Sequence, residues 1–369
     1  MKLLFWISFG LAAYTNFGYA GCLWVLAWLR PRPIARGENA PRVSIVIAAR
    51  NEEVNLPAKL ENLRRLRYPA DRLQIVVASD GSTDRTAEII HAQGKAIVPV
   101  ILEESHGKAH ALNEAVRRAT GEVLFFQDAR QVVHPDALEE LVSCFVDPEV
   151  GAVSGELLLE TSEGTPSPDA LGIYWKMEKA VRKLESATGS VVGVTGAIYA
   201  IRRELYTEMP KGTILDDVFV PMHVARMGKR VVFQPTATAR DRIFSQRGKE
   251  FERKVRTLTG NYQLLRLAPW MLTPANPLLF RLASHKLLRL ALPLLLVAML
   301  AASGACAGPF YRSVFWLQIA FYLLATLGTV RPQMKKFKPV AIASTFVMLN
   351  AAAVAAFYNF VLGRSKVWL

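Results

Sequence analysis

Cysteine is scarce in this chain, and the few cysteines lie far apart. The 369 residues include three, Cys22, Cys144 and Cys306. Such wide spacing encodes neither a disulfide framework nor a thiolate metal site. We expect these side chains to be small buried apolar groups in a reducing compartment.

Two common nucleotide-binding motifs are also absent. No GxGxxG and no GxxxxGK[ST] follows an expected strand, which excludes a dinucleotide fingerprint and a P-loop. The net charge of +14 invites a nucleic-acid partner, but the basic residues are dispersed and cluster mainly beside apolar runs. The sequence also has no zinc-finger, helix-turn-helix or aromatic RNA motif. We therefore predict no nucleic-acid partner, and anionic lipid or a phosphorylated substrate fits the charge better.

Long apolar runs are what the chain does have. Each is close to the ~20 residues that cross a bilayer, and together they occupy residues 3–29, 287–307, 313–330 and 340–362. The first run outlasts the apolar part of a signal peptide and lacks a small-residue cleavage site, which favours an anchor. We predict an N-terminal transmembrane anchor (1–30), a soluble domain (41–262), an interfacial amphipathic segment (263–286) and three transmembrane helices (287–363).

Basic residues beside the apolar runs predict the orientation of the chain. Arg30, Arg32 and Arg36 follow the first run, and the basic segment RPQMKKFKP separates the last two. Because cytosolic loops are enriched in Lys and Arg, both places are expected to be cytosolic. The sequence thus predicts an integral membrane protein with a cytosolic soluble domain. Arg364 and Lys366, which would then lie outside, are a minor violation of the rule.

Short apolar strands alternate with helical segments in the soluble domain. The expected strands, at 43–49, 73–79, 96–102 and 122–128, are β-branched and aromatic runs without polar alternation, which is typical of parallel strands covered on both faces. Helical periodicity fills the intervals, at 56–66, 86–93 and 108–119. This alternation predicts an α/β fold with a Rossmann-like parallel sheet and right-handed crossovers.

Acidic residues follow the ends of these strands. The run IVVASDGSTD ends a strand on Asp80, then supplies Gly for a tight turn and Ser/Thr to cap a helix. Asp80 is therefore expected at the carboxyl edge of the sheet, where open α/β folds bind ligands, and we expect it to contact a base or ribose. Glu52 and Asp84 are expected at the same edge and are further candidate ligand contacts.

Asp128 and Lys108 are candidates for binding a diphosphate. Asp128, in FFQDAR, ends the fourth strand, where a carboxylate can bind a divalent cation that bridges phosphates. A helix cap or a turn is the alternative for this residue. Lys108, in HGKAHALN, opens a helix whose N-terminal dipole favours an anion, so we expect it to face phosphate.

Two further pairs of charged residues stand out. Asp216 and Asp217, in ILDDVFVP, precede an amphipathic helix. Because adjacent carboxylates repel, one is expected to pair with cations and the other to remain available as a base; capping the helix is the alternative. Arg253 and Arg256 lie three apart on one helical face before the membrane, placed to bind a diphosphate or lipid headgroups.

These motifs resemble, in order and spacing, the membrane-bound family 2 glycosyltransferases, which include cellulose, hyaluronan and poly-N-acetylglucosamine synthases. The resemblance covers nearly the whole chain and rests on SIVIAARNEE, SDGSTDRT, GKAHALN, FFQDAR, GVTGAIYAIRREL, ILDDVFVP and RKVRTLTGN. It implies a GT-A fold, a nucleotide-sugar donor, Mg²⁺ or Mn²⁺, inverting transfer to an acceptor hydroxyl, and a bacterial inner membrane.

The resemblance also implies roles for single residues. Glu52 and Asp80 match nucleoside contacts, with Asp84 beside them, and Lys108 matches a nucleotide contact. Asp128 matches the first acid of Asp-x-Asp, the predicted metal ligand. The other matches are Asp217 to the general base of Thr-Glu-Asp, with Asp216 before it, and Gly196 and Arg256 to the acceptor and diphosphate region.

Two departures from the family pattern bear on metal use and on the product. Arg130 stands where the second acid of Asp-x-Asp is usual. The cation would then be held by Asp128 and the phosphates alone, or be less essential, with Arg130 carrying part of the charge neutralisation. In Gln-x-x-Arg-Trp, Arg253 replaces the Gln and Thr257 the Trp that supports the acceptor sugar in synthases. We expect transfer of one or a few sugars to a lipid-linked or saccharide acceptor, with processive synthesis as the alternative.

Two other functional classes are considered. A transporter is disfavoured because no ionisable residue lies deep in the apolar runs, whereas translocation pathways usually need one. A non-catalytic nucleotide-binding membrane regulator remains an alternative, since Arg130 and Thr257 are compatible with lost activity. Retention of Asp217 favours an enzyme.

Overall fold

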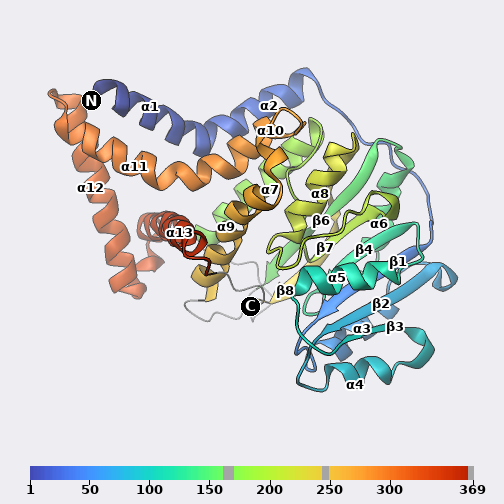
Figure 1. The fold of residues 1–369 in the computed structure, drawn as a ribbon. Helices are drawn as coiled ribbons and strands as arrows, with labels where there is room; N and C mark the ends of the chain where they lie inside the picture. The colour runs from blue at the N-terminus through green and yellow to red at the C-terminus, as the bar shows by residue number, and fades with distance from the viewer. Residues whose placement is uncertain (161–169, 243–248, 365–369) are drawn as a thin grey trace.

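An eight-stranded mixed sheet organises the soluble domain (Figure 1). The structure, a computed structural model, describes residues 1–160, 170–242 and 249–364. Within them the strand order is β3-β2-β1-β4-β7-β6-β8-β5. The strands are β1 (Val43–Ala49), β2 (Leu73–Asp80), β3 (Val98–Leu102), β4 (Val123–Asp128), β5 (Val132–Val133), β6 (Val150–Glu160), β7 (Ile198–Arg202) and β8 (Arg230–Arg242).

The four strands expected from the sequence are present, and all are parallel. β1 lies between β2 and β4, and β3 pairs with β2. The register places Ala48 beside Asp128 and Asp80 beside Leu102, so the strand ends reach one edge as predicted. Beyond β4 the sheet is no longer parallel throughout, because β7 pairs antiparallel with both β4 and β6.

Helices cover both faces of the sheet and create two apolar cores. One core includes Val46, Leu112 and Phe126, and the other includes Ile45 and Leu60. Val46 and Ile45 separate because successive side chains of a strand point to opposite faces. The helices of this domain are α3 (Leu56–Arg64), α4 (Thr86–His91), α5 (Lys108–Arg117), α6 (Ala137–Val142), α7 (Ala170–Ala187), α8 (Asp216–Arg226) and α9 (Lys249–Leu267).

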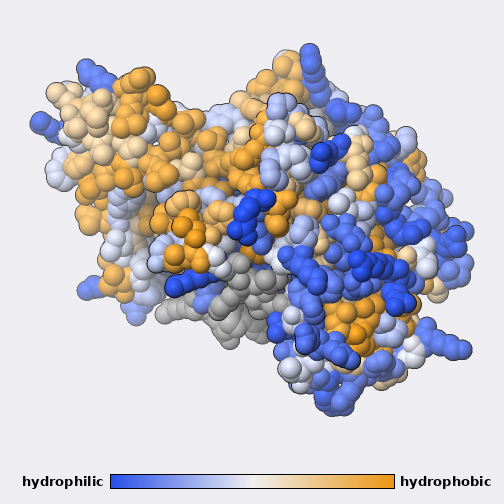
Figure 2. All heavy atoms as spheres, viewed as in Figure 1, coloured by the Kyte–Doolittle hydropathy of each residue, from blue (hydrophilic) through white to orange (hydrophobic). Residues whose placement is uncertain are grey.

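The C-terminal part of the chain is helical and apolar. Three helices of the described residues are long and apolar enough to cross a membrane: Leu279–Ala305, Pro309–Val330 and Lys338–Val361. They correspond to α10 (Leu279–Leu282), η7 (Ala283–Leu287) and α11 (Leu288–Ala305), then α12 (Pro309–Val330) and α13 (Lys338–Val361). Figure 2 shows apolar side chains gathered on this side of the molecule and hydrophilic ones over the sheet domain.

The first of these helices begins earlier than the sequence indicated. It starts at Leu279 and not at residue 287, and so includes the end of the predicted interfacial segment 263–286. Three polar residues, Ser284, His285 and Lys286, interrupt the apolar pattern there and hid the start of the helix. The region before it consists of the end of α9 and a short helical turn at Pro269–Leu272.

The N-terminal helix is less clearly a span than predicted, and it is not among the three above. It consists of α1 (Lys2–Ala13), a π-helical turn η1 (Tyr14–Gly18) and α2 (Tyr19–Leu29). Thr15 and Asn16 lower the hydropathy of its centre, and their side chains donate hydrogen bonds back to carbonyls of α1. Figure 1 shows α1 alongside α11 and α2 reaching α7. A membrane-spanning role for this helix stays a prediction.

Candidate functional site

Lys108 joins two carboxylates at the carboxyl edge of the sheet. Its ammonium group lies 2.9 Å from Asp128 Oδ1 and 3.2 Å from Asp216 Oδ2. Asp128 ends β4, Asp216 begins α8 and Lys108 begins α5, so residues far apart in the sequence meet here. Burial acts to lower the pKa of Lys108, but Asp128 and Asp216 outweigh it and raise that pKa. Lys108 is therefore a stable positive charge at this edge.

Asp217 lies next to this cluster. Its Oδ1 is buried and has no hydrogen-bond partner among the described residues. Burial, and then the neighbouring charge of Asp216, raise its pKa from 3.8 to about 6, although nearby cations act in the opposite direction. An added Cβ at Gly196 would lie 3.4 Å from Asp217 Cβ and 3.7 Å from its Oδ2. Gly196 thus leaves room beside a carboxylate that is suited to accept a proton near neutral pH.

Asp80 lies at the predicted edge, but its carboxylate is bonded to the protein. It is completely buried and accepts hydrogen bonds from Ser105 Oγ (2.8 Å) and from the backbone N–H groups of His106 and Gly107 (both 2.9 Å). These bonds fix the loop that leads directly into Lys108. Asp80 therefore positions Lys108, and its contact with a nucleoside stays a prediction.

Glu52 and Asp84 lie in two loops that contact each other. Asp84 accepts hydrogen bonds from the backbone N–H of Glu53 (3.0 Å) and from the N–H and hydroxyl of Thr86. Burial alone would raise the pKa of Asp84, but these hydrogen bonds lower it. Glu52 accepts a hydrogen bond from Asn55 at 2.6 Å. Both carboxylates thus lie at the predicted edge, and each already accepts hydrogen bonds from the protein.

Arg130, the residue in the place of a second acid, is paired with an acid from another strand. Its guanidinium lies 2.7 Å from Oδ2 of the buried Asp241 on β8, and Gln131 donates to the same oxygen. Sequence reasoning missed Asp241, because β8 is distant in the chain and carries no recognisable motif. The carboxylate of Asp241 therefore lies beside the guanidinium of Arg130, the residue that replaces the second acid of Asp-x-Asp.

Arg253 and Arg256 lie on α9, which is fixed to the loop before Asp216. Gln263 on this helix accepts a hydrogen bond from the N–H of Ile214 (2.9 Å) and donates one to the carbonyl of Gly212 (2.8 Å). These contacts place α9 beside the loop that leads into Asp216 and Asp217. The binding roles of Arg253 and Arg256 stay predictions.

Three other positively charged side chains near the site were not predicted. Arg182 on α7 donates to Thr195 Oγ1 at 2.7 Å, and Arg182 and Lys286 both act on the pKa of Asp217. Lys59 is buried and donates to Gln127 Oε1 and to the carbonyl of Gln131, both at 2.8 Å. Burial lowers the pKa of Lys59 to about 7, against the raising effect of Asp128. None of these residues belongs to a motif, so only the fold brings them to the site.

Asp128 offers a partly exposed carboxylate to a divalent cation at this edge. Asp128 is about one-third exposed, and its Oδ1 faces Lys108. No group of three or more His, Cys, Asp or Glu side chains within the described ranges is arranged to hold a metal ion. Mg²⁺ is commonly held by one or two carboxylates together with substrate phosphates. Asp128 therefore fits a cation that arrives with a diphosphate, and does not fit a cation held by protein ligands alone.

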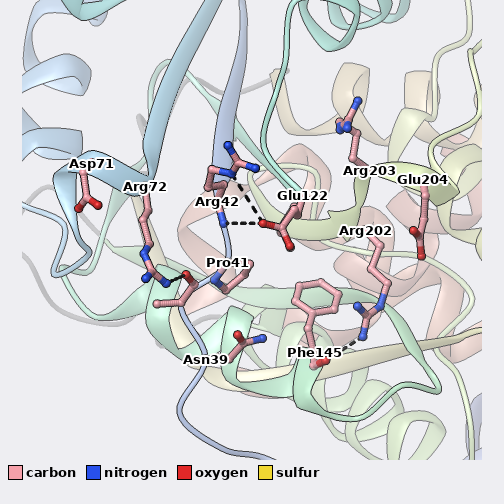
Figure 3. Close-up of a pocket in the computed structure, with 12 residues that line it drawn as sticks. Asn39, Pro41, Arg42, Asp71, Arg72, Glu122, Phe145, Arg202, Arg203 and Glu204 are labelled. Carbon is pink, nitrogen blue, oxygen red and sulfur yellow. Dashed lines mark hydrogen bonds and ion pairs between the residues drawn. The ribbon is translucent and has the colours of Figure 1, made fainter.

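A cavity of about 730 Å³ lies at the opposite edge of the sheet (Figure 3). Its walls include residues that precede β1 and β4, and some of its charged side chains bond to each other or to backbone carbonyls. Arg42 faces Glu122 at 3.8 Å, and Arg202 donates to the carbonyl of Phe145 at 2.7 Å. This cavity is separate from the cluster around Lys108.

Comparisons with known proteins agree with this geometry. Residues 44–209 match the sequence model of the family described as glycosyl transferase family 2. A poly-beta-1,6-N-acetyl-D-glucosamine synthase of Staphylococcus aureus is 23% identical over 243 residues, 64% of this chain and 58% of that protein. One of Staphylococcus epidermidis is 24% identical over 229 residues, 60% of this chain and 55% of that protein. The matches thus span little more than half the length of these relatives.

A solved structure resembles the chain over nearly its full length. A mannosyltransferase from Pyrobaculum calidifontis, in complex with GDP-Man and Mn²⁺, has a TM-score of 0.71 and 25% identity, covering 98% of this chain and 100% of that one. This likeness confirms the predicted GT-A fold, and three apolar helices follow the sheet domain as predicted.

Proposed function

Because residues 44–209 form a glycosyltransferase family 2 domain, we propose that this chain transfers a sugar from a nucleotide-sugar donor to an acceptor hydroxyl, with inversion at the anomeric carbon. The observation that carries the proposal is the meeting of Lys108, Asp128 and Asp216 next to Asp217. Such a transfer has two requirements. One is a positively charged group that binds the diphosphate, and the other is a carboxylate able to act as a base.

In the proposed reaction Asp217 accepts the proton of the acceptor hydroxyl. The acceptor oxygen forms its bond to the anomeric carbon while the bond from that carbon to the diphosphate oxygen breaks, and the nucleoside diphosphate leaves. Lys108 stabilises the negative charge that develops on this leaving group. A divalent cation bound by Asp128 and the phosphates would add further charge neutralisation.

Other residues would position the two substrates. Glu52, Asp80 and Asp84 are proposed to lie along the nucleoside and Lys108 along its phosphates. Gly196, with Arg253 and Arg256, is proposed to border the acceptor and the diphosphate. Arg130 would neutralise part of the negative charge of the diphosphate. Its ion pair with Asp241 would limit this contribution.

We propose a lipid-linked or saccharide acceptor and transfer of one or a few sugars. Thr257 offers no aromatic platform, and its hydroxyl donates to the carbonyl of Arg253 in the same helix. Tyr262 and Trp270, the nearest aromatic substitutes, are engaged in packing: Tyr262 stacks on Phe360 and Trp270 contacts His223. Processive synthesis is the second candidate, since the Staphylococcus relatives are named as synthases of a polysaccharide.

A screen of labelled donors tests the proposal. The full chain, purified in native lipid, is incubated with single radiolabelled nucleotide sugars, and both nucleoside diphosphate release and label in lipid or saccharide are measured. We expect one donor to give both products. Tight nucleotide binding without turnover for every donor would instead identify a non-catalytic regulator. After a chase with excess unlabelled donor, long labelled chains would identify a processive synthase.

The proposed base predicts how activity depends on pH. Because Asp217 must be deprotonated to accept a proton and its pKa is about 6, kcat/KM should fall as the pH is lowered through about 6 and level off above it. The measurement is the initial rate from pH 4.5 to 8 in a constant-ionic-strength buffer. A rate that is flat down to pH 4.5 would contradict the assignment.

The proposed role of Asp128 as a ligand of the divalent cation predicts how donor binding depends on metal. Asp128→Ala should weaken donor binding when Mg²⁺ or Mn²⁺ is present and leave it nearly unchanged in chelator, because the carboxylate acts through the cation. Donor affinity of wild type and variant, with and without metal, is measured by calorimetry. Full wild-type transfer in excess chelator would remove the cation from the reaction and shift the phosphate role to Arg130, Arg253 and Arg256.

The membrane orientation is proposed from the basic loop between α12 and α13. We propose an integral protein of a bacterial inner membrane with the sheet domain in the cytosol, since Lys335 and Lys336 are expected on the cytosolic side. In intact cells, a cysteine at Lys336 should resist an impermeant thiol reagent and one at Gly308 should react, on a background with the native cysteines replaced. The reverse pattern would place the donor site outside and contradict a cytosolic donor.

A further inference from the structure

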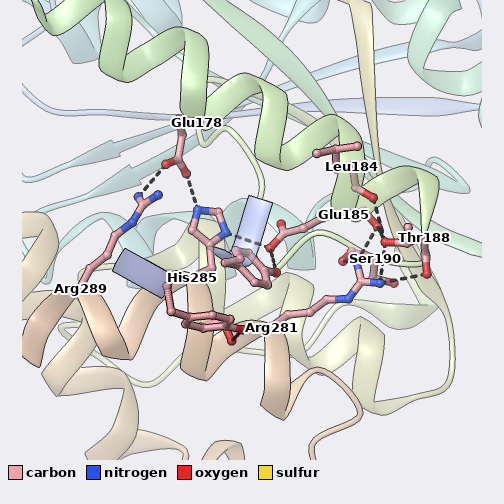
Figure 4. A network of polar contacts seen from close by, with 11 residues as sticks. Glu178, Leu184, Glu185, Thr188, Ser190, Arg281, His285 and Arg289 are labelled. Atoms are coloured by element: carbon pink, nitrogen blue, oxygen red, sulfur yellow. Dashed lines mark hydrogen bonds and ion pairs between the residues drawn. The ribbon is translucent and has the colours of Figure 1, made fainter. Parts of the chain in front are cut away.

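A buried polar junction connects the first C-terminal apolar helix to α7 (Figure 4). His285, in the π-helical turn η7, is 2% exposed. Its Nε2 lies 2.8 Å from Glu178 Oε1 and its Nδ1 2.9 Å from Glu185 Oε1. Tyr19 of the N-terminal helix donates to the same Glu185 oxygen at 2.6 Å. Burial alone would raise the pKa of Glu178 and Glu185, but the charge of His285 lowers both.

Arg281, one turn earlier, binds the segment that follows α7. Its guanidinium donates to the carbonyl oxygens of Glu185 (2.5 Å), Ser190 (2.7 Å) and Thr188 (2.9 Å), and to the Thr188 hydroxyl (2.9 Å). Gly189 packs against it, since an added Cβ there would lie 3.1 Å from Arg281 Nη2. Three backbone carbonyls are thus fixed by one side chain from the apolar helix.

The same segment continues to Asp217. The N–H of Val194 donates to the backbone carbonyl of Asp217 at 2.8 Å, and a Cβ at Gly193 would lie 3.1 Å from that oxygen. Arg182 on α7 adds a second connection, since it donates to Thr195 Oγ1 at 2.7 Å. Residues 188–196 therefore connect the bonds of Arg281 directly to the backbone of Asp217.

Stability alone is a poor reason for such a junction. Burying charged groups costs desolvation, and apolar groups of similar volume often stabilise a fold as well or better. A network with many directional hydrogen bonds instead fixes one geometry. What it fixes here is the place of residues 188–196, and hence of Asp217, relative to the apolar helices.

We propose that Arg281 and His285 are positioning residues for the transfer reaction: they anchor residues 188–196 to the first C-terminal apolar helix and so hold Asp217 where it meets the acceptor hydroxyl. The inference rests on the proposed function. It implies that the docking of the apolar helices sets the geometry of the base, without any contact between Arg281 or His285 and the substrates.

Substitutions of Arg281 test this inference in the full chain in lipid. Arg281→Met removes the bonds to residues 188–190, and Arg281→Lys keeps a charge that can restore some of them. Gln318→Leu is the matched control, because Gln318 is a buried polar side chain that joins α12 to the carbonyl of Leu296 on α11. Its amide nitrogen also donates to Tyr322 Oη on α12, so the bonds of this group stay within the apolar helices. Three quantities are measured on the folded fraction: kcat, donor KM, and hydrogen exchange of residues 188–196.

Arg281→Met should lower kcat about ten- to hundred-fold, the scale of a displaced catalytic group, leave donor KM within about two-fold, and speed exchange at Val194. Arg281→Lys should recover part of kcat, and Gln318→Leu should match wild type. Wild-type kcat, or unchanged exchange in Arg281→Met, would overturn the inference. Inactivity of the wild type would instead overturn the proposed function, and exchange alone would then decide whether Arg281 anchors this segment.

Discussion

Replacing Asp217 with asparagine is expected to lower sugar transfer by about a hundred-fold to ten-thousand-fold, the usual contribution of a general base. The amide is nearly the same size as the carboxylate but cannot accept the proton of the acceptor. Donor binding should persist, because Lys108 and Asp128 remain in place. The measurement pairs kcat for transfer with the dissociation constant of the donor.

Two other substitutions make this result specific to Asp217. Glu208→Gln changes an exposed carboxylate that pairs with Arg117 on the surface of the same domain, and it should transfer at the wild-type rate. Asp216→Asn should cost less than Asp217→Asn, because Asp216 faces Lys108. Turnover of Asp217→Asn within a few-fold of wild type would show that another group is the base.

Replacing Lys108 with methionine is expected to weaken donor binding about ten- to hundred-fold, the value of a hydrogen bond to a charged group. It leaves Asp128 and Asp216 without their shared cation, so the edge repels a diphosphate. The same change should move the pH midpoint of kcat/KM upward, because Lys108 acts to lower the pKa of Asp217. Donor calorimetry and the pH profile are measured on the same preparation.

Arginine and a surface lysine serve as controls for this prediction. Lys108→Arg keeps the charge and should recover part of the donor affinity. Lys95→Met removes an exposed lysine from the turn Gly94–Ala96 and should leave both measurements unchanged. An unaltered donor affinity in Lys108→Met would show that the diphosphate lies elsewhere.

The sequence was informative where chemistry and local structure share a motif. Asp80 and Asp128 end apolar strands, so parallel pairing was enough to place both at one edge. For these two residues the order of strand, turn and helix determined the position in space. Lys108 opens α5 and Asp217 lies in the first turn of α8, and only the family resemblance implied that both serve the same site.

Contacts between distant segments could not be predicted in this way. Asp241 reaches Arg130 through β8, which pairs parallel with β6 and antiparallel with the short β5, and the sequence pattern revealed neither pairing. His285 meets Glu178 only because a polar turn interrupts an apolar helix, and that turn had been expected in an interfacial segment. The hydrogen bonds of Asp80 to the loop before Lys108 were not predicted either. An acidic side chain at the end of a strand can bind either a ligand or backbone N–H groups, and the sequence does not distinguish the two.

The anomeric configuration of the transferred sugar tests the central claim most directly. Asp217 acting as a base implies a single displacement, in which the acceptor oxygen attacks opposite the departing diphosphate. The proton NMR spectrum of early product, recorded with the donor found by the labelled screen, should show the configuration opposite to that of the donor. Product that retains the configuration of the donor would contradict this account.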